Sequence, residues 1–165
     1  MTHLPVLTKT ILKMVTLLVF VTLLASRSFA EPVPSVDGFV RGFVKPGFTH
    51  FSEDAQALAV SMDGLCTAPS QNTLTAAQER FKATALSWSR VEYIQLGPLA
   101  QNNAKERILF WPDRRGRGLR QVQRLLAKED PSALTVESLQ KKSVAVQGLG
   151  ALEFILFGID HEALA

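Results

Sequence analysis

Residues 143–158, SVAVQGLGALEFILFG, are the segment that most restricts how this chain can fold. The segment is helix-like and strongly apolar, yet it carries one acid, Glu153. Burying an unpaired carboxylate costs several kcal/mol, so this acid needs either a partner or a function. A helix that is apolar on nearly every side needs neighbours on several sides, and the segment therefore predicts a packed, multi-helix fold.

The remainder of the chain also has helical periodicity, and no run of alternating β-branched residues predicts a strand. We expect one helix over Asp37–Leu65, kinked or divided at Pro46–Gly47. A second is expected to open with a capping box at Thr75–Gln78 and to end near Leu96, before Gly97-Pro98. Further helices are expected at Asn103–Leu109, Leu119–Lys128, Thr135–Lys142 and Gly148–Gly158. The predicted fold class is all-α, most simply a helical bundle.

Residues 1–30 have the features of a cleavable signal peptide. Lys9 and Lys13 precede the apolar run Met14–Ala25, and Ser28-Phe29-Ala30 places small residues at the two positions that a signal peptidase reads. A retained anchor is the alternative, although the run is shorter than the roughly 20 residues of a membrane span. We expect an exported protein of the periplasm or cell envelope, with membrane contact only through an uncleaved leader and one domain over residues 31–165.

Charge argues against a nucleic-acid partner once this leader is set aside. The chain has 18 Lys+Arg and 15 Asp+Glu, and residues 1–30 contain three of the basic residues and no acid. The remaining part therefore has as many acidic as basic residues, and it lacks the net positive charge that usually accompanies nucleic-acid binding.

Residues 148–153 resemble the Gly-x-His-x-x-Glu signature of the imelysin family, bacterial envelope proteins classified as M75-type peptidases. Gly150 stands in the histidine position of that signature, and Glu153 stands in the position of its acid. The loop Phe110–Asp113, followed by Arg120-Gln121, resembles a second segment of the family. The resemblance runs from about Phe39 to Gly158, and it implies the first half of a double helical bundle.

Imelysin-like proteins are longer than this chain and continue with further helices, including a second cysteine-bearing segment. The resemblance thus implies that residues 31–165 are the N-terminal half of such a protein, truncated at the C-terminus. Cys66, the single cysteine, fits this interpretation, and a buried free thiol is the alternative. Without downstream helices, the last helix should expose an apolar patch. Its members would be Leu149, Leu152, Phe154, Ile155 and Phe157.

Glu92 and Glu153 are the first candidate metal ligands, because facing helices of a bundle can bring two carboxylates to one interior pocket. The alternative is that each acid forms a structural ion pair with an arginine. The candidate arginines are Arg90, Arg107 and Arg120. His50 is the histidine that could replace the missing signature histidine, and a surface or capping role is its alternative. The expected metal is iron or zinc, with an affinity that is weak or lost because Gly150 supplies no ligand.

A basic cluster surrounds the Phe110–Asp113 loop. Its candidate anion ligands are Arg107, Arg114, Arg115 and Arg120, with Arg117 and Arg124 nearby. An anionic ligand, an acidic polymer or lipid head groups would suit the cluster, and a solvated loop and helix surface is the alternative. Trp111, beside these arginines, is expected to plug the core.

The sequence lacks the usual hydrolase motifs Gly-x-Ser-x-Gly and His-Glu-x-x-His. A metallopeptidase needs three protein ligands and an open position for water, and no such set stands out. The favoured function is therefore non-enzymatic: an envelope protein, linked to iron uptake by the family resemblance, that binds a metal ion or a small ligand near Glu153. The alternatives are an M75-type metallopeptidase and an interaction module that binds an envelope protein partner.

Overall fold

The computed structural model of this 165-residue chain describes residues 13–14 and 35–165. The predicted signal peptide lies almost wholly outside these residues; of it, only Lys13 and Met14 are described, both helical and exposed. Within the described residues, no helix is both long enough and apolar enough to span a membrane. Residues 36–165 form one structural unit.

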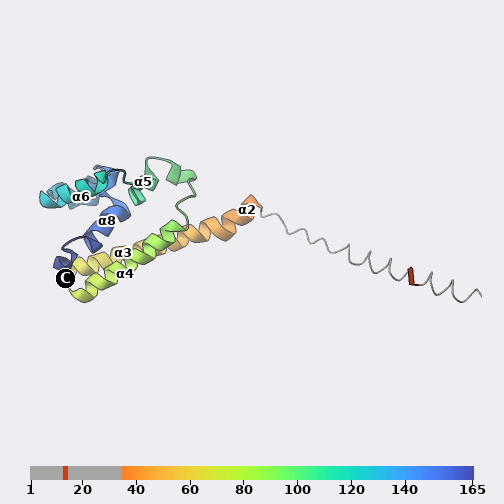
Figure 1. Ribbon diagram of the computed structural model, residues 1–165, viewed down its shortest axis with the longest axis horizontal. Coiled ribbons are helices and arrows are strands. Elements are labelled where there is room, and N and C mark those ends of the chain that lie inside the picture. The colour runs from red at the N-terminus through yellow and green to blue at the C-terminus, as the bar shows by residue number, and fades with distance from the viewer. Residues whose placement is uncertain (1–12, 15–34) are drawn as a thin grey trace, which may run out of the picture. The chain divides into compact units, whose positions relative to one another are not determined.

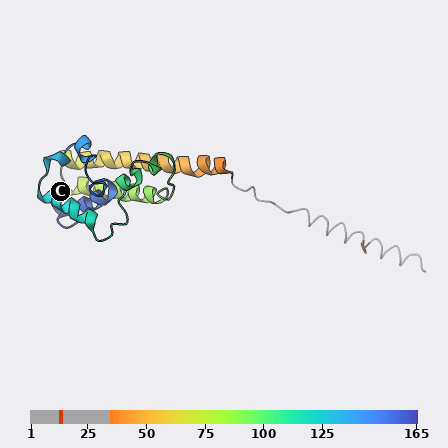
Figure 2. The same cartoon turned by 90° about the horizontal axis from the view of Figure 1, so that it is seen from above.

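A long helical hairpin is the base of the fold (Figures 1 and 2). Its arms are α3 (Lys45–Thr67) and α4 (Gln71–Ser89), which pack against each other. Ser70 begins α4, because its hydroxyl oxygen accepts a 3.2 Å hydrogen bond from the backbone N–H of Thr73. The predicted capping box at Thr75–Gln78 is therefore wrong. Thr75 lies inside α4, where its hydroxyl donates to the Gln71 carbonyl at 2.8 Å.

The helical run of the first arm begins before α3. It comprises α2 (Val36–Phe39), a π-helical segment η1 (Val40–Val44) and then α3, so Pro46 does not divide it as expected. Pro46 is the second residue of α3, which directly follows the π-helical segment, so its missing N–H falls where the bonding pattern of the run changes. The backbone adjusts one turn earlier, where the Lys45 N–H bonds to the Val40 carbonyl, five residues back.

The second arm ends earlier than the sequence indicates. Helix α4 stops at Ser89, and residues 91–93 form a turn, so Glu92 lies after the helix and not on it. The apolar periodicity continues past Ser89 because the turn itself buries Val91 and Ile94. Their burial completes the hairpin's apolar side without further helix.

The remaining elements form a second layer on the hairpin (Figure 1). In chain order they are η2 (Gly97–Ala100), α5 (Ala104–Ile108), α6 (Arg117–Ala127), η3 (Pro131–Ala133), α7 (Val136–Leu139), η4 (Val144–Val146), α8 (Gly148–Phe157) and η5 (His161–Leu164). Helix α8 packs against α4 on one side and against α6 on another. No strand occurs in residues 35–165, and the all-α prediction is confirmed.

Two apolar clusters hold the layers together. The larger joins the hairpin to α8 and includes Leu65, Leu74, Trp88 and Leu156. The smaller joins α6, η4 and α8 and is formed by Val122, Val146 and Ala151, with half-buried neighbours. Most of the buried apolar side chains thus belong to the cluster on the hairpin side of α8, and burial of apolar area provides the main favourable contribution to folding.

The expected exposed patch on α8 is largely covered. Leu149 is buried in the larger cluster, which corrects its assignment to that patch. Leu152, Phe154 and Ile155 are half-buried, and Phe157, at 38 %, is exposed. Cys66 is free and exposed at the end of α3, so the buried-thiol alternative is wrong.

Candidate functional site

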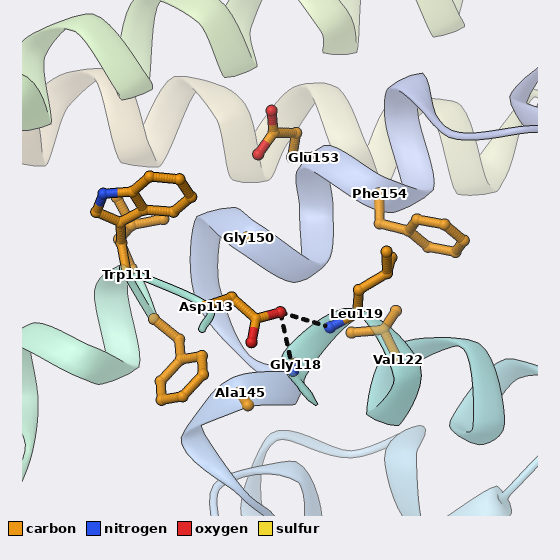
Figure 3. Close-up of a pocket in the computed structure, with 11 residues that line it drawn as sticks. Trp111, Asp113, Gly118, Leu119, Val122, Ala145, Gly150, Glu153 and Phe154 are labelled. Atoms are coloured by element: carbon orange, nitrogen blue, oxygen red, sulfur yellow. Dashed lines mark hydrogen bonds between the residues drawn. The ribbon is translucent and has the colours of Figure 1, made fainter. Parts of the chain in front are cut away.

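The loop Phe110–Asp113 and helix α8 meet at one pocket of about 330 Å³ (Figure 3). These are the two segments that carry the strongest sequence resemblance. The first turns of α6 complete the wall. Apolar side chains of the lining are Leu109, Phe110, Leu119, Val122 and Phe154, and Trp111, Asp113, Gly150 and Glu153 also line the pocket.

Asp113 joins the loop to α6. Its Oδ2 accepts hydrogen bonds from the backbone N–H groups of Gly118 at 3.0 Å and Leu119 at 3.1 Å, as Figure 3 shows. Gly116, at the start of α6, has no side chain to cap these groups, so Asp113 supplies the cap from outside the helix.

The same hydrogen bonds act on the charge of Asp113. The bond from Gly118 is the main reason that the pKa of Asp113 lies below its usual value of 3.8, with desolvation opposing it and the bond from Leu119 assisting. The other carboxylate oxygen, Oδ1, is buried and has no hydrogen-bond partner in the described part of the chain. Asp113 therefore keeps a negative charge, and one of its carboxylate oxygens is buried without accepting a hydrogen bond in the described part of the chain.

Glu153 lies on the open side of α8. Sequence reasoning treated it as an acid buried in an apolar helix, but the residue is exposed. The reason is that α4 and α6 cover two sides of α8 and leave uncovered the side that bears Glu153. No hydrogen bond or ion pair to Glu153 forms within residues 35–165, so the alternative of a structural ion pair is not observed here.

The two glycines of α8 differ in what surrounds them. Gly148 has a positive φ of 67°, and a Cβ there would collide with the backbone carbonyls of Arg107 and Ile108, so the end of α5 packs directly on this residue. At Gly150 a Cβ would meet only Leu109 Cδ1, at 3.9 Å. The position that lacks the signature histidine therefore has room for an added Cβ.

Glu92 and His50 lie in other places. Glu92 is half-buried in the turn after α4. His50 is exposed on α3, and its Nδ1 lies 3.7 Å from the Glu53 carboxylate, an arrangement that matches the surface alternative. Within the described residues, no group of three or more His, Cys, Asp or Glu side chains could hold a metal ion. The structure thus does not bring Glu153, Glu92 and His50 together, and the donor set of the pocket does not fit a tightly bound metal.

Two of the candidate anion ligands, Arg107 and Arg120, bond to other parts of the chain. Arg107 Nη1 donates to the Gln140 carbonyl at 3.0 Å and to Gln147 Oε1 at 3.3 Å, and so it ties α5 to the segment before α8. Arg120 donates to the Arg115 carbonyl at 2.6 Å, and Arg114 is exposed. None of these arginines lines the pocket beside Glu153.

Trp111 does not plug the core. It is 74 % exposed, and the neighbouring Leu109 and Phe110 are the loop residues that lie half-buried against the second layer. Asp113 was not predicted as a site residue, although an acid a few residues before a helix start is typical of a capping side chain. Figure 3 shows both residues on the loop that faces α8.

Fold and pocket together define an all-α protein whose candidate site joins an aromatic and acidic loop to a glycine-containing helix. The family model for imelysin (peptidase M75) matches residues 44–165, which include every wall of the pocket, and the chain belongs to the imelysin family. Comparisons with curated proteins and with solved structures gave no match.

Proposed function

We propose that this protein is an exported, non-enzymatic member of the imelysin family that binds a small ligand in the pocket between the Phe110–Asp113 loop and α8. One observation carries the proposal: the two segments with the strongest family resemblance, distant in the sequence, line the same pocket. Its volume of about 330 Å³ falls within the range of small-molecule sites. Its lining combines apolar walls with two acids, the usual composition of such sites.

A metal ion is the ligand that family resemblance implies, and the donor set supports only weak binding. Glu153 offers one exposed carboxylate, Asp113 Oδ2 is already used by the α6 cap, and Gly150 offers no ligand atom. A peptidase mechanism needs a firmly held metal with an open position, so the same deficit weighs against the metallopeptidase alternative. A link to iron uptake then rests on family membership alone.

Export rests on residues 1–30 and predicts cleavage after Ala30. Intact mass of the protein recovered from the periplasmic fraction tests this, with Glu31 expected as the new N-terminus. A protein that keeps residues 1–30 and stays with the membrane fraction would contradict cleavage and favour the retained anchor.

Ligand binding can be tested with a fragment library observed by saturation-transfer NMR on the purified protein. Hits are expected to lose their signal in Trp111→Ala and Glu153→Ala and to keep it in Glu162→Gln, which alters an exposed acid outside the pocket. Hits that bind all variants equally, or a library without hits, would contradict the proposed site. Titrations with zinc and ferric ions, together with a chelator-sensitive protease assay, separate this function from the metal-dependent alternatives.

A further inference from the structure

Building on the proposed ligand pocket, we infer that its ligand is a small organic cation, of the quaternary ammonium or protonated alkylamine class. The pocket presents carboxylates, an exposed indole and apolar walls, without a basic side chain among its lining residues.

The charged residues that line the pocket are all acidic. Asp113 and Glu153 line it, and no Lys, Arg or His does. Glu153 makes no ion pair within residues 35–165, and the nearby Arg120 is engaged with the Arg115 carbonyl. A positively charged ligand would therefore meet the unpaired carboxylate of Glu153, while an anion would be repelled by both acids.

Asp113 adds to the negative charge of the pocket lining. Its Oδ2 is used by the cap of α6, but its Oδ1 is buried without a hydrogen-bond partner in the described part of the chain. A buried, unpartnered carboxylate oxygen is costly unless a positive group lies nearby. Arg120 already acts on the Asp113 charge, and a cation seated in the pocket would add to this compensation.

Trp111 supplies the second element of cation recognition. Its side chain is 74 % exposed, and Trp111 and Glu153 both line the pocket (Figure 3). Indole is the aromatic ring that attracts cations most strongly, and combinations of aromatic rings and acids recognise quaternary ammonium groups in proteins. Exposure of so large an apolar side chain is itself unfavourable, and a ligand that covers the ring would relieve it.

The walls distinguish an organic cation from a hydrated metal ion. Leu109, Leu119, Val122 and Phe154 would strip water from a metal ion without offering replacement ligands. The same side chains suit the methyl or methylene groups that surround the charge of an alkylammonium ion. Apolar contact and charge attraction can thus act on one ligand together.

Three probes of nearly equal shape test the charge preference: choline, its neutral isostere 3,3-dimethylbutan-1-ol, and the anion 3,3-dimethylbutanoate. Isothermal titration of the purified protein should give the highest affinity for choline and an affinity about fivefold lower for the alcohol, with no measurable binding of the anion. Glu153→Gln should lower choline affinity about fivefold and leave the alcohol unchanged. Glu162→Gln should alter neither, and Trp111→Leu should weaken choline more than the alcohol.

The outcomes separate this inference from the function on which it rests. Equal affinity for choline and the alcohol would overturn the cation inference while leaving a functional ligand pocket. Fragment hits that are mainly neutral or anionic, with no choline binding, would do the same. Zinc that binds more tightly than choline and is lost in Glu153→Gln would replace the organic cation with a metal. A pocket that binds neither fragments nor probes would remove the proposed function itself.

Discussion

The side-chain amide of Gln78 donates a 2.8 Å hydrogen bond to the backbone carbonyl of Leu156. Gln78 lies on α4, and Leu156 lies in the last turn of α8, where carbonyls have no donor within their own helix. The bond therefore satisfies a helix end and at the same time fixes α8, which carries Glu153, on the hairpin.

Replacing Gln78 by Ala should lower the free energy of unfolding by about 1 kcal/mol, since one part-buried hydrogen bond is lost. Urea denaturation followed by circular dichroism measures this. Gln56→Ala is the matched control, because Gln56 is exposed on α3 and its amide contacts only Ser52, at 3.5 Å. Equal losses in the two variants would show that the bond to Leu156 contributes nothing specific.

Asp113 should make stability depend on acid. Its pKa is lowered in the folded state, chiefly by the hydrogen bond from Gly118, so the unfolded chain takes up the proton at a higher pH. Its stabilising contribution is therefore complete above the usual value of 3.8 and is lost as the pH falls below it. Asp113→Asn should melt earlier than the native protein at neutral pH, and the difference should shrink on acidification.

Thermal unfolding at several pH values between neutral and acid tests this dependence, with Asp63→Asn as the control for removing one exposed negative charge. A difference in melting temperature between Asp113→Asn and the native protein that stays constant across this range would mean that the carboxylate cap is not the cause.

Gly148→Ala should unfold the protein or destabilise it by more than about 2 kcal/mol, because it combines a positive φ with a collision against the Arg107 and Ile108 carbonyls. Gly150→Ala, two residues later, should change stability by less than about 1 kcal/mol, since the added methyl group meets only Leu109 and alanine favours helix. Chemical denaturation of both variants provides the comparison. Equal tolerance at the two positions would contradict the close approach of α5 to α8.

Gly150→His should increase zinc affinity at least about tenfold, because it adds an imidazole ligand one helical turn from Glu153, where the family signature has its histidine. Competition with a zinc-sensitive dye measures the gain, and Gly150→Ala controls for the altered backbone. Loss of the gain in a variant that also carries Glu153→Gln would assign the site to both side chains. No gain over Gly150→Ala would show that more than the histidine is missing.

The helices were predictable from apolar periodicity, but their ends were not in every case. Helix α4 ends at Ser89 because the following turn buries Val91 and Ile94, and burial in a turn continues the same apolar pattern that a longer helix would show. Ser70 opens that helix, and the competing Thr75–Gln78 motif lies inside it. Local patterns of this kind identify residues that are able to begin or end a helix. Tertiary packing then decides which of these residues does so.

The site was predictable in its segments and not in its geometry. The sequence singled out the Phe110–Asp113 loop and the α8 segment separately, and only the packing of α6 against α8 makes them two walls of one pocket. The exposure of Trp111 and Glu153 was missed because both belong to types or segments that are usually buried. Which side of α8 remains open depends on its neighbours, and a single helix's sequence does not contain that information.

The hairpin of α3 and α4 forms from adjacent segments and holds most of the larger apolar cluster, whereas the pocket walls rest on the smaller cluster of Val122, Val146 and Ala151. Regions with fewer buried apolar contacts open more readily, so backbone amides of α6 should exchange with solvent faster than those of α4. A ligand that bridges the Phe110–Asp113 loop and α8 would slow exchange in α6 and α8 and leave α4 unchanged. Ligand binding would then be observed as slower amide exchange that is confined to the second layer, the part of the fold that opens most readily.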